Sequence, residues 1–230
     1  MIGIIGAMDS EVEAIFAQMA SKEKIQINNL TFYKGKIFDK DLVVVKCGVG
    51  KVNAALCTQL LILTFKVDCV INTGIAGATG KGLNIYDFVV STEALYHDFD
   101  TTFFGYKLGQ VPGMPETFKA DEKLTNLAVQ VFEKSDLAKN HKIQKGLIAS
   151  GDQFIAGGEK KNFIVENFHP LCVEMEGCAI AHACHANGVP FVIIRCMSDC
   201  ADENVQSTYE EEKASKVSSN FLLEVLKEIL

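Results

Sequence analysis

Short apolar runs alternate with helix-like segments from one end of the chain to the other. The runs at 69–72, 88–91 and 191–196 are apolar at successive positions rather than at every second one, which is typical of strands covered on both faces. Residues Val12, Ile15, Phe16 and Met19 instead recur with the spacing of one helix face. Buried strands separated by helices predict an α/β fold, with the sheet packed between helices.

The same reading predicts most elements of the chain. We expect strands at 2–7, 31–38, 42–47, 69–72, 88–91, 143–150, 171–175 and 191–196. We expect a buried helix at 52–65, a helix with Asp121 as its N-cap, a helix at 176–187 closed by Gly188, and a C-terminal helix whose apolar side includes Phe221. Because no repeat or linker divides the chain, residues 1–230 are expected to form one domain.

Composition excludes several classes of function. The chain has 230 residues, 48% of them apolar, and a net charge of −7 without a basic block, so disorder and nucleic-acid binding are disfavoured. The N-terminus does not have the pattern of a signal peptide, and no apolar run approaches the length of a membrane helix. Most of the eight cysteines lie within apolar runs, which predicts free thiols and a cytoplasmic location.

Polar residues stand where four predicted strands end. The segments are 6–11, 73–77, 174–177 and 198–199, and they bring Glu11, Glu176 and Asp199 to the edges of apolar runs. Ligands of α/β sheets bind at the carboxyl ends of strands, so these three acids could share one pocket. Each segment also has a simpler explanation: Glu11 and Glu176 fit acids at the start of a helix, Ser198-Asp199 fits a helix cap, and Gly74 and Gly77 fit a turn.

Taken together, six motifs identify a resemblance. In chain order they are 2–8 (Ile-Gly-Ile-Ile-Gly-Ala-Met), 72–77 (Asn-Thr-Gly-Ile-Ala-Gly), 96–98 (Tyr-His-Asp), 150–155 (Ser-Gly-Asp-Gln-Phe-Ile), 173–176 (Val-Glu-Met-Glu) and 194–199 (Ile-Arg-Cys-Met-Ser-Asp). This pattern resembles the 5′-methylthioadenosine/S-adenosylhomocysteine nucleosidases of the purine nucleoside phosphorylase superfamily, over essentially the whole chain. The resemblance implies a three-layer α/β/α fold with a mixed, partly barrel-like sheet, and hydrolysis of the N-glycosidic bond between adenine and a 5′-thio-substituted ribose.

The resemblance also implies roles for the acids. Asp199 would protonate N7 of the departing adenine, oriented by Ser198, and Glu11 would activate the attacking water with Arg195 nearby. Adenine leaves poorly as an anion, and the sugar then carries positive charge that carboxylates stabilise, so acids on both sides of the bond are chemically coherent. The resemblance implies that no cofactor is needed. No metal site is expected, because His182 and His185 lack partners at ligand spacing.

Other residues would hold the nucleoside. By resemblance, Glu176 would bind the ribose hydroxyls, Met175 would pack on the sugar, Phe154 would stack on adenine and the backbone of Ile155 would read its Watson–Crick edge. The loop residues Ile75, Ala76 and Gly77 are also assigned to substrate binding. The chain departs from the family at Ile75, where many members have Ser, so a hydroxyl contact is expected to be missing.

The resemblance further implies a homodimer. Phe104 and Pro112 of the neighbouring subunit would cover the 5′-alkylthio group, and Tyr209 would complete that pocket. The aromatic cluster at 99–106, interleaved with Gly and Pro, is also what a symmetric interface would use.

Three alternatives stay open. A phosphorylase of the same superfamily would need cations for phosphate, whereas the first loop carries Asp9, Glu11 and Glu13 and the chain has a single Arg. A hydrolase acting on 6-amino-6-deoxyfutalosine would share the same acids and differ only at the 5′ side. A non-catalytic nucleoside binder would not need three acids in one cleft.

Overall fold

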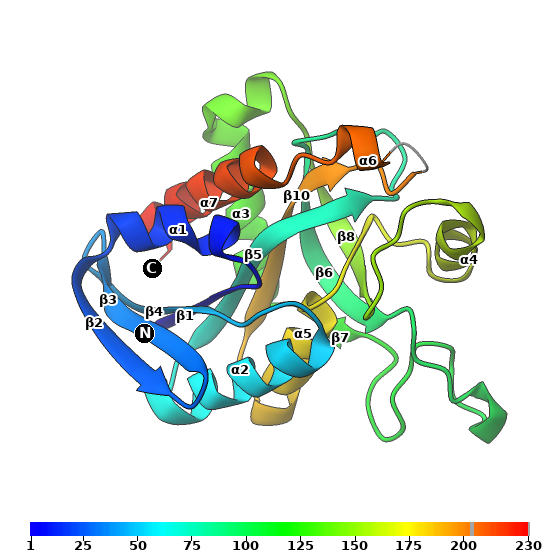
Figure 1. Cartoon of the computed structure of the whole chain (residues 1–230), viewed down its shortest axis with the longest axis horizontal. Helices are drawn as coiled ribbons and strands as arrows, with labels where there is room; N and C mark the ends of the chain where they lie inside the picture. The colour runs from blue at the N-terminus through cyan, green and yellow to red at the C-terminus, as the bar shows by residue number, and fades with distance from the viewer. Residues whose placement is uncertain (203–204, 230) are drawn as a thin grey trace.

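A single mixed sheet, closed on itself at one side, organises the molecule (Figure 1). The computed structural model describes residues 1–202 and 205–229. Its strands are β1 (Ile2–Gly6), β2 (Ala20–Ile27), β3 (Leu30–Ile37), β4 (Lys40–Lys46), β5 (Cys69–Ala78), β6 (Phe88–Tyr96), β7 (Phe118–Lys119), β8 (Ile143–Ser150), β9 (Cys172–Glu174) and β10 (Phe191–Asp199). The strand order is β10-β6-β8-β9-β5-β1-β4-β3-β2, and β10 also pairs with β5. Strands β5, β10, β6, β8 and β9 therefore close a five-stranded mixed barrel, and β1, β4, β3 and β2 extend the sheet from β5.

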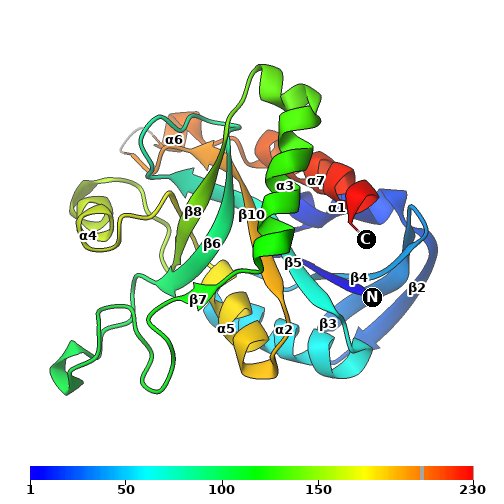
Figure 2. The same ribbon diagram turned by 180° about the vertical axis from the view of Figure 1, so that it is seen from behind.

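Helices cover both faces of this sheet (Figures 1 and 2). They are α1 (Asp9–Gln18), α2 (Lys51–Phe65), α3 (Glu122–Lys134), α4 (Gly158–Phe168), α5 (Gly177–Asn187), α6 (Val205–Thr208) and α7 (Glu211–Glu228), with 3₁₀ turns at Thr102–Phe104 and Asp136–Lys139. Helix α7 packs against α1 and α3 on one side, and α2 packs against α5 on the other. The implied three-layer α/β/α fold with a partly barrel-like sheet is confirmed.

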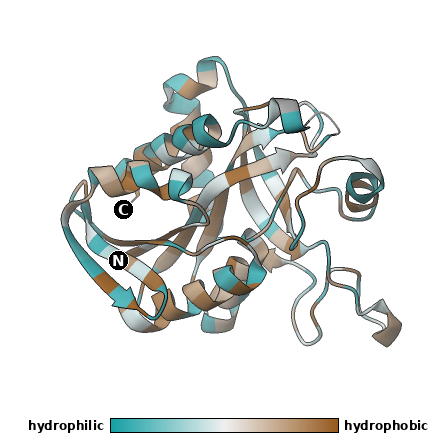
Figure 3. Ribbon diagram, viewed as in Figure 1, coloured by the Kyte–Doolittle hydropathy of each residue, from teal (hydrophilic) through white to brown (hydrophobic). Residues whose placement is uncertain are grey.

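Three apolar clusters form the core, and the two larger ones lie on opposite sides of the sheet. Successive strand residues contribute to opposite clusters: Ile4 and Val44 face α1 and α7, whereas Ile5 and Val43 face α2 and α5. This alternation explains why the strands read as continuous apolar runs, because side chains on both faces must be desolvated. In Figure 3 the strands are correspondingly rich in apolar residues, and most polar residues lie on the outer helices and loops.

The sequence located most elements correctly, with some differences. All the expected strands are present, and the Asp121 side chain accepts a hydrogen bond from the Leu124 amide, 2.9 Å away, as an N-cap. Strand β2 and helix α4 were not expected, because both have largely exposed, charged sequences. The expectation that the helix at 52–65 is buried is wrong for its outer face: Val52 and Leu56 are 68% and 61% exposed.

The sheet topology brings the polar strand ends together. Strands β1, β5 and β10 are parallel neighbours, so their carboxyl ends share one edge. Strand β9 is antiparallel to β5, with Val173 opposite Gly77, so the residues after β9 return along β5 toward Ile75.

No helix among residues 1–202 and 205–229 is long and apolar enough to cross a membrane.

Candidate active site

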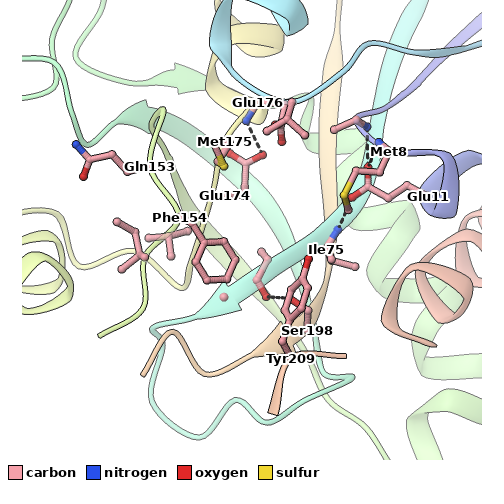
Figure 4. Close-up of a pocket in the computed structure, with 16 residues that line it drawn as sticks. Met8, Glu11, Ile75, Gln153, Phe154, Glu174, Met175, Glu176, Ser198 and Tyr209 are labelled. Carbon is pink, nitrogen blue, oxygen red and sulfur yellow. Dashed lines mark hydrogen bonds between the residues drawn. The ribbon is translucent and has the colours of Figure 1, made fainter. Parts of the chain in front are cut away.

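A cavity of about 240 Å³ opens where these strand ends meet (Figure 4). Its lining comes from the loop after β1 and the first turn of α1, from the loop before α2, and from β5 and β10. The segment after β8, strand β9 with the residues that lead into α5, and Tyr209 between α6 and α7 complete it. The lining residues are Ala7, Met8, Glu11, Val49, Ile75, Ala76, Gly77, Gln153, Phe154, Ile155, Val173, Glu174, Met175, Glu176, Ser198 and Tyr209. The cavity is therefore mostly apolar, with carboxylates and a hydroxyl as its polar groups, as expected of a site for a small ligand.

Glu11 is a buried carboxylate held by backbone amides. Its Oε2 accepts hydrogen bonds from the amides of Ala7 and Met8, at 2.6 and 3.1 Å, and its Oε1 accepts one from Ile75, at 3.0 Å. The first turn of α1 and strand β5 thus fix it from two sides. Burial raises the pKa of Glu11 above its usual value of 4.5, although Arg195 and the three amides oppose that rise. A carboxylate of raised pKa at a cavity wall is suited to accept a proton.

Glu176 approaches the cavity from the start of α5, where it occupies the N-cap position. Its Oε1 accepts a hydrogen bond from the Gly50 amide at 2.8 Å, and the residue is only 6% exposed. Burial and the nearby charge of Glu174 raise the pKa of Glu176 to about 8, against the Gly50 amide and Arg195. One carboxylate oxygen of Glu176 has its hydrogen bond from the backbone, and the side chain faces the cavity (Figure 4).

Arg195 lies behind the cavity wall rather than on it. Its guanidinium Nη2 donates to Glu174 Oε2 and to Asn72 Oδ1, each at 2.5 Å. Burial disfavours its charge, but Glu174, Glu11 and Glu176 outweigh that effect and raise the pKa of Arg195. Arg195 thus places one fixed positive charge beneath three acids. Gly74 makes room for it, since a side chain there would collide with the Glu11 carboxylate and contact Arg195.

The end of β10 supplies a hydroxyl–carboxyl pair. Ser198 Oγ donates to Asp199 Oδ2 at 2.8 Å, and Asp199 Oδ1 accepts from the Ala201 amide at 2.7 Å. Ser198 lines the cavity, whereas Asp199 lies just behind it and is 2% exposed. A Cβ at Gly77 would be 3.0 Å from Asp199 Oδ1, so the bare backbone at Gly77 leaves the carboxyl close to the cavity.

Aromatic side chains form the mouth of the cavity. The rings of Phe154 and Tyr209 meet edge to face, with centroids 5.8 Å apart, and both are partly exposed. In Figure 4 they lie on the side of the cavity away from Glu176. Ile155 is buried beside them and Met175 is half-buried. An exposed ring over a cavity is suited to stack on a planar ligand.

The structure brings most of the predicted site residues into one cavity. Those that line it are Glu11, Ile75, Ala76, Gly77, Phe154, Ile155, Met175, Glu176, Ser198 and Tyr209. Asp199 and Arg195 lie behind the wall. Phe104 and Pro112 do not line it and are exposed on the loop between β6 and β7, so within one chain they have no contact with the site.

Sequence reasoning assigned no role to six residues of the wall: Ala7, Met8, Val49, Gln153, Val173 and Glu174. Glu174 had the clearest signal, because it is an acid directly following the apolar run that contains Val173. Its Oε2 accepts from the amides of Glu176 and Gly177, at 3.2 and 2.7 Å, and its Oε1 accepts from the Ser150 hydroxyl. Glu174 therefore satisfies the otherwise free amides that begin α5.

Within the described ranges, no group of three or more His, Cys, Asp or Glu could hold a metal ion.

Comparison with known proteins gives consistent results. The family model described as the phosphorylase superfamily matches residues 1–230. A 5′-methylthioadenosine/S-adenosylhomocysteine nucleosidase of Actinobacillus succinogenes is 46% identical, with 99% of each chain covered. The crystal structure of the nucleosidase of the same name from Neisseria meningitidis, in complex with methylthio-immucillin-A, is 38% identical with a TM-score of 0.95 and 99% of each chain covered. A futalosine hydrolase from Helicobacter pylori is 35% identical, with a TM-score of 0.93, 99% of this chain covered and 97% of that chain.

Proposed function

Because this chain belongs to the phosphorylase superfamily, and within it to the 5′-methylthioadenosine/S-adenosylhomocysteine nucleosidases, we propose that it hydrolyses the N-glycosidic bond of both nucleosides. The products are adenine and the 5-thio-substituted ribose. One observation carries this function: three separate segments bring Glu11, Glu176 and the Ser198–Asp199 pair to a single cavity of about 240 Å³.

Asp199 acts as the general acid. Adenine is a poor leaving group as an anion, so a proton delivered to N7 as the bond breaks lowers the barrier. The Ser198 hydroxyl and the Ala201 amide each hold one oxygen of Asp199, which fixes the direction in which the carboxyl presents its proton. Support comes from the position of this pair beside Gly77, where no side chain stands between Asp199 and the cavity.

Glu11 acts as the base that activates water. Three amides fix its carboxylate, and its burial favours uptake of a proton. As the bond to adenine weakens, the ribose becomes oxocarbenium-like, and carboxylates on its side of the cavity stabilise that charge. Arg195 lies behind the wall, where its charge opposes the rise in the pKa of Glu11 that burial causes, and the same guanidinium also binds Glu174.

Recognition of the nucleoside follows from the rest of the lining. Glu176 accepts hydrogen bonds from the two ribose hydroxyls, and Met175 packs on the sugar. Phe154 stacks on adenine while the backbone of Ile155 reads its Watson–Crick edge. The cavity wall formed by Ile75, Ala76 and Gly77 contacts the substrate from β5. Ile75 contributes only its backbone amide to the catalytic groups, through its bond to Glu11.

A second copy of the chain completes the 5′ end of the site. Phe104 is 73% exposed and Pro112 is also exposed, and neither lines the cavity of its own chain. Exposed apolar residues of α2 and this loop are what a homodimer interface would bury. In the dimer, Phe104 and Pro112 of the neighbouring subunit cover the alkylthio group, and Tyr209 closes the pocket.

A cytoplasmic location fits the thiols. All eight cysteines are free, and six of them are buried. A chain with that many thiols and no disulfide suits a reducing compartment.

The lining favours water over phosphate as the nucleophile. None of the residues lining this cavity is Lys or Arg, and a phosphate dianion needs several cations or clustered amides. The deciding experiment incubates the protein with methylthioadenosine or S-adenosylhomocysteine in phosphate-free buffer and identifies the products. Adenine with the free thio-sugar supports the proposal, whereas a strict requirement for phosphate refutes it. Including 6-amino-6-deoxyfutalosine as a third substrate tests whether the enzyme accepts a larger 5′ substituent, because one similar structure is a futalosine hydrolase.

A further inference from the structure

Outside the cavity, a chain of polar contacts leads to Glu176. Lys51 Nζ donates to both oxygens of Asp98, each at 2.7 Å, and Asp98 Oδ2 accepts from the Asp152 amide at 2.8 Å. Asp152 Oδ1 in turn accepts from the Lys51 amide at 2.8 Å. The preceding residue, Gly50, donates its amide to Glu176. We propose that Lys51 is a positioning residue, which fixes the Gly50 amide against the carboxylate that binds the ribose hydroxyls. This inference rests on the function proposed above for Glu176.

The start of α2 depends on this arrangement. Gly50 is the N-cap of α2, and it has no side chain to cap the helix. Asp152, which follows β8 and is 101 residues away, supplies the missing acceptor for the Lys51 amide. Gly50 adopts a φ of 99°, and a Cβ there would lie 3.1 Å from Asp152 Oδ1. Asp152 therefore holds the backbone amide of Lys51, the residue directly after the Gly50 amide that binds Glu176.

The Lys51 charge holds Asp98 and Asp152 together. Their carboxylates both face Lys51, whose Nζ is 3.8 Å from Asp152 Oδ2. The Lys51 and Asp98 side chains are only 22% and 12% exposed, so solvent screens the pair weakly. Burial alone would raise the pKa of Asp98, but the Lys51 ammonium and the Asp152 amide lower it. Without the cation, two carboxylates linked through the Asp152 amide would repel each other, and Asp152 would shift away from the start of α2.

Glu176 would respond to that shift. Four groups influence the pKa of Glu176: Glu174 from β9, Glu11 from α1, Arg195 from β10 and the Gly50 amide from the start of α2. Glu176 in turn influences the pKa of Cys47, which follows β4. Among these, Gly50 and Arg195 favour the ionised form. Losing the Gly50 hydrogen bond leaves Glu176 harder to ionise and less well oriented, so it accepts the ribose hydroxyls less well. Arg195 is not part of the hydrogen bonds that join Lys51, Asp98 and Asp152, so it would remain in place.

The experiment compares Lys51→Met with Lys51→Arg in the full-length enzyme. We expect Lys51→Met to raise KM for methylthioadenosine about tenfold, the size of effect that one lost hydrogen bond to a charged group gives, with kcat changed less. The acid limb of the kcat/KM–pH profile moves to higher pH. Lys51→Arg should reverse part of both changes, because it restores a positive charge but on a side chain of different length and shape. Inhibition by adenine, which has no ribose, stays at the wild-type level in every variant.

Controls separate positioning from general damage. Lys36→Ala removes an exposed lysine paired with Asp41 on the β3–β4 hairpin and should leave all these values unchanged. If Lys51→Met does not fold, Asp98→Asn replaces it in the experiment, because it weakens the contacts of Asp98 with Lys51 and with the Asp152 amide. A folded variant with wild-type KM and pH profile overturns the proposal, as does equal weakening of adenine and methylthioadenosine. Failure of the proposed function would appear separately, as absence of adenine release by the wild type.

Discussion

Glu174 and Arg195 form an ion pair behind the cavity, with Oε2 and Nη2 2.5 Å apart and both side chains at most 3% exposed. The pair joins β9 to β10, and Arg195 is also held by Asn72 on β5. It therefore links three strands of the barrel at the point where they support the proposed catalytic groups. Placing the only arginine of the chain here balances part of the negative charge that Glu11, Glu174 and Glu176 bring into a buried site.

Breaking that pair should destabilise the protein strongly. Glu174→Gln keeps the shape of the side chain but leaves the Arg195 charge buried without its partner. Loss of one member of a buried pair costs about 3–5 kcal/mol, and the retained hydrogen bonds place this variant near the lower limit. Urea unfolding of the wild type and the variant measures the difference. Lys36→Ala, at an exposed pair, serves as the control and should cost less than about 1 kcal/mol; similar losses in the two variants would contradict this account.

Glu11→Gln should remove the base without removing substrate binding. Gln cannot accept a proton from water, so we expect kcat to fall about 10²–10⁴-fold while the Kd for methylthioadenosine changes little. Steady-state kinetics and calorimetry give the two quantities. Glu13→Gln is a matched control, because Glu13 lies on the same helix but is exposed. If Glu11→Gln kept wild-type kcat, another group would be the base.

Local signals in the sequence predicted an α/β fold and acids at the strand ends, whereas the barrel-like sheet and the roles of Phe154, Met175 and Tyr209 came only from the resemblance to a family. Apolar runs mark strands buried on both faces, and the acids stand at their ends, as with Val173 before Glu174. Features created by distant contacts were not predictable in the same way. Nothing near Gly50 indicates that Asp152 caps α2, and nothing near Arg195 indicates that Glu174 and Asn72 draw it behind the wall. Strand β2 was missed because its exposed residues carry no apolar pattern.

The pH dependence of stability should reflect the raised pKa of Glu176. Between about 4.5, its ordinary value, and about 8 in the folded protein, the folded state binds more protons than the unfolded state. Its contribution to stability is complete below pH 4.5 and is lost as pH rises through 8. Urea unfolding at a series of pH values should show this fall, and Glu176→Gln should reduce its slope. An unchanged slope in the variant would show that Glu176 does not hold a proton in the folded protein.

The partner subunit should matter for the 5′ end of the substrate. Phe104→Ala removes an exposed ring that has no contact with its own site, and we expect KM for methylthioadenosine to rise about tenfold, the scale of one buried aromatic anchor. Phe163, an exposed Phe on α4, provides the control: Phe163→Ala should leave KM unchanged. Sedimentation establishes the oligomeric state in parallel. A monomeric wild type with full activity would refute the role given to Phe104.

The proposed hydrolysis depends on proton donation by Asp199, and the Asp199→Asn variant isolates that step. The variant keeps the shape of the side chain and the neighbouring Ser198 and Ala201 groups, but it cannot deliver a proton to N7. Release of adenine from methylthioadenosine should fall by about 10²–10⁴-fold, while calorimetry still detects binding of the nucleoside. Adenine release at the wild-type rate would contradict the claim that Asp199 and Glu11 act on the same glycosidic bond.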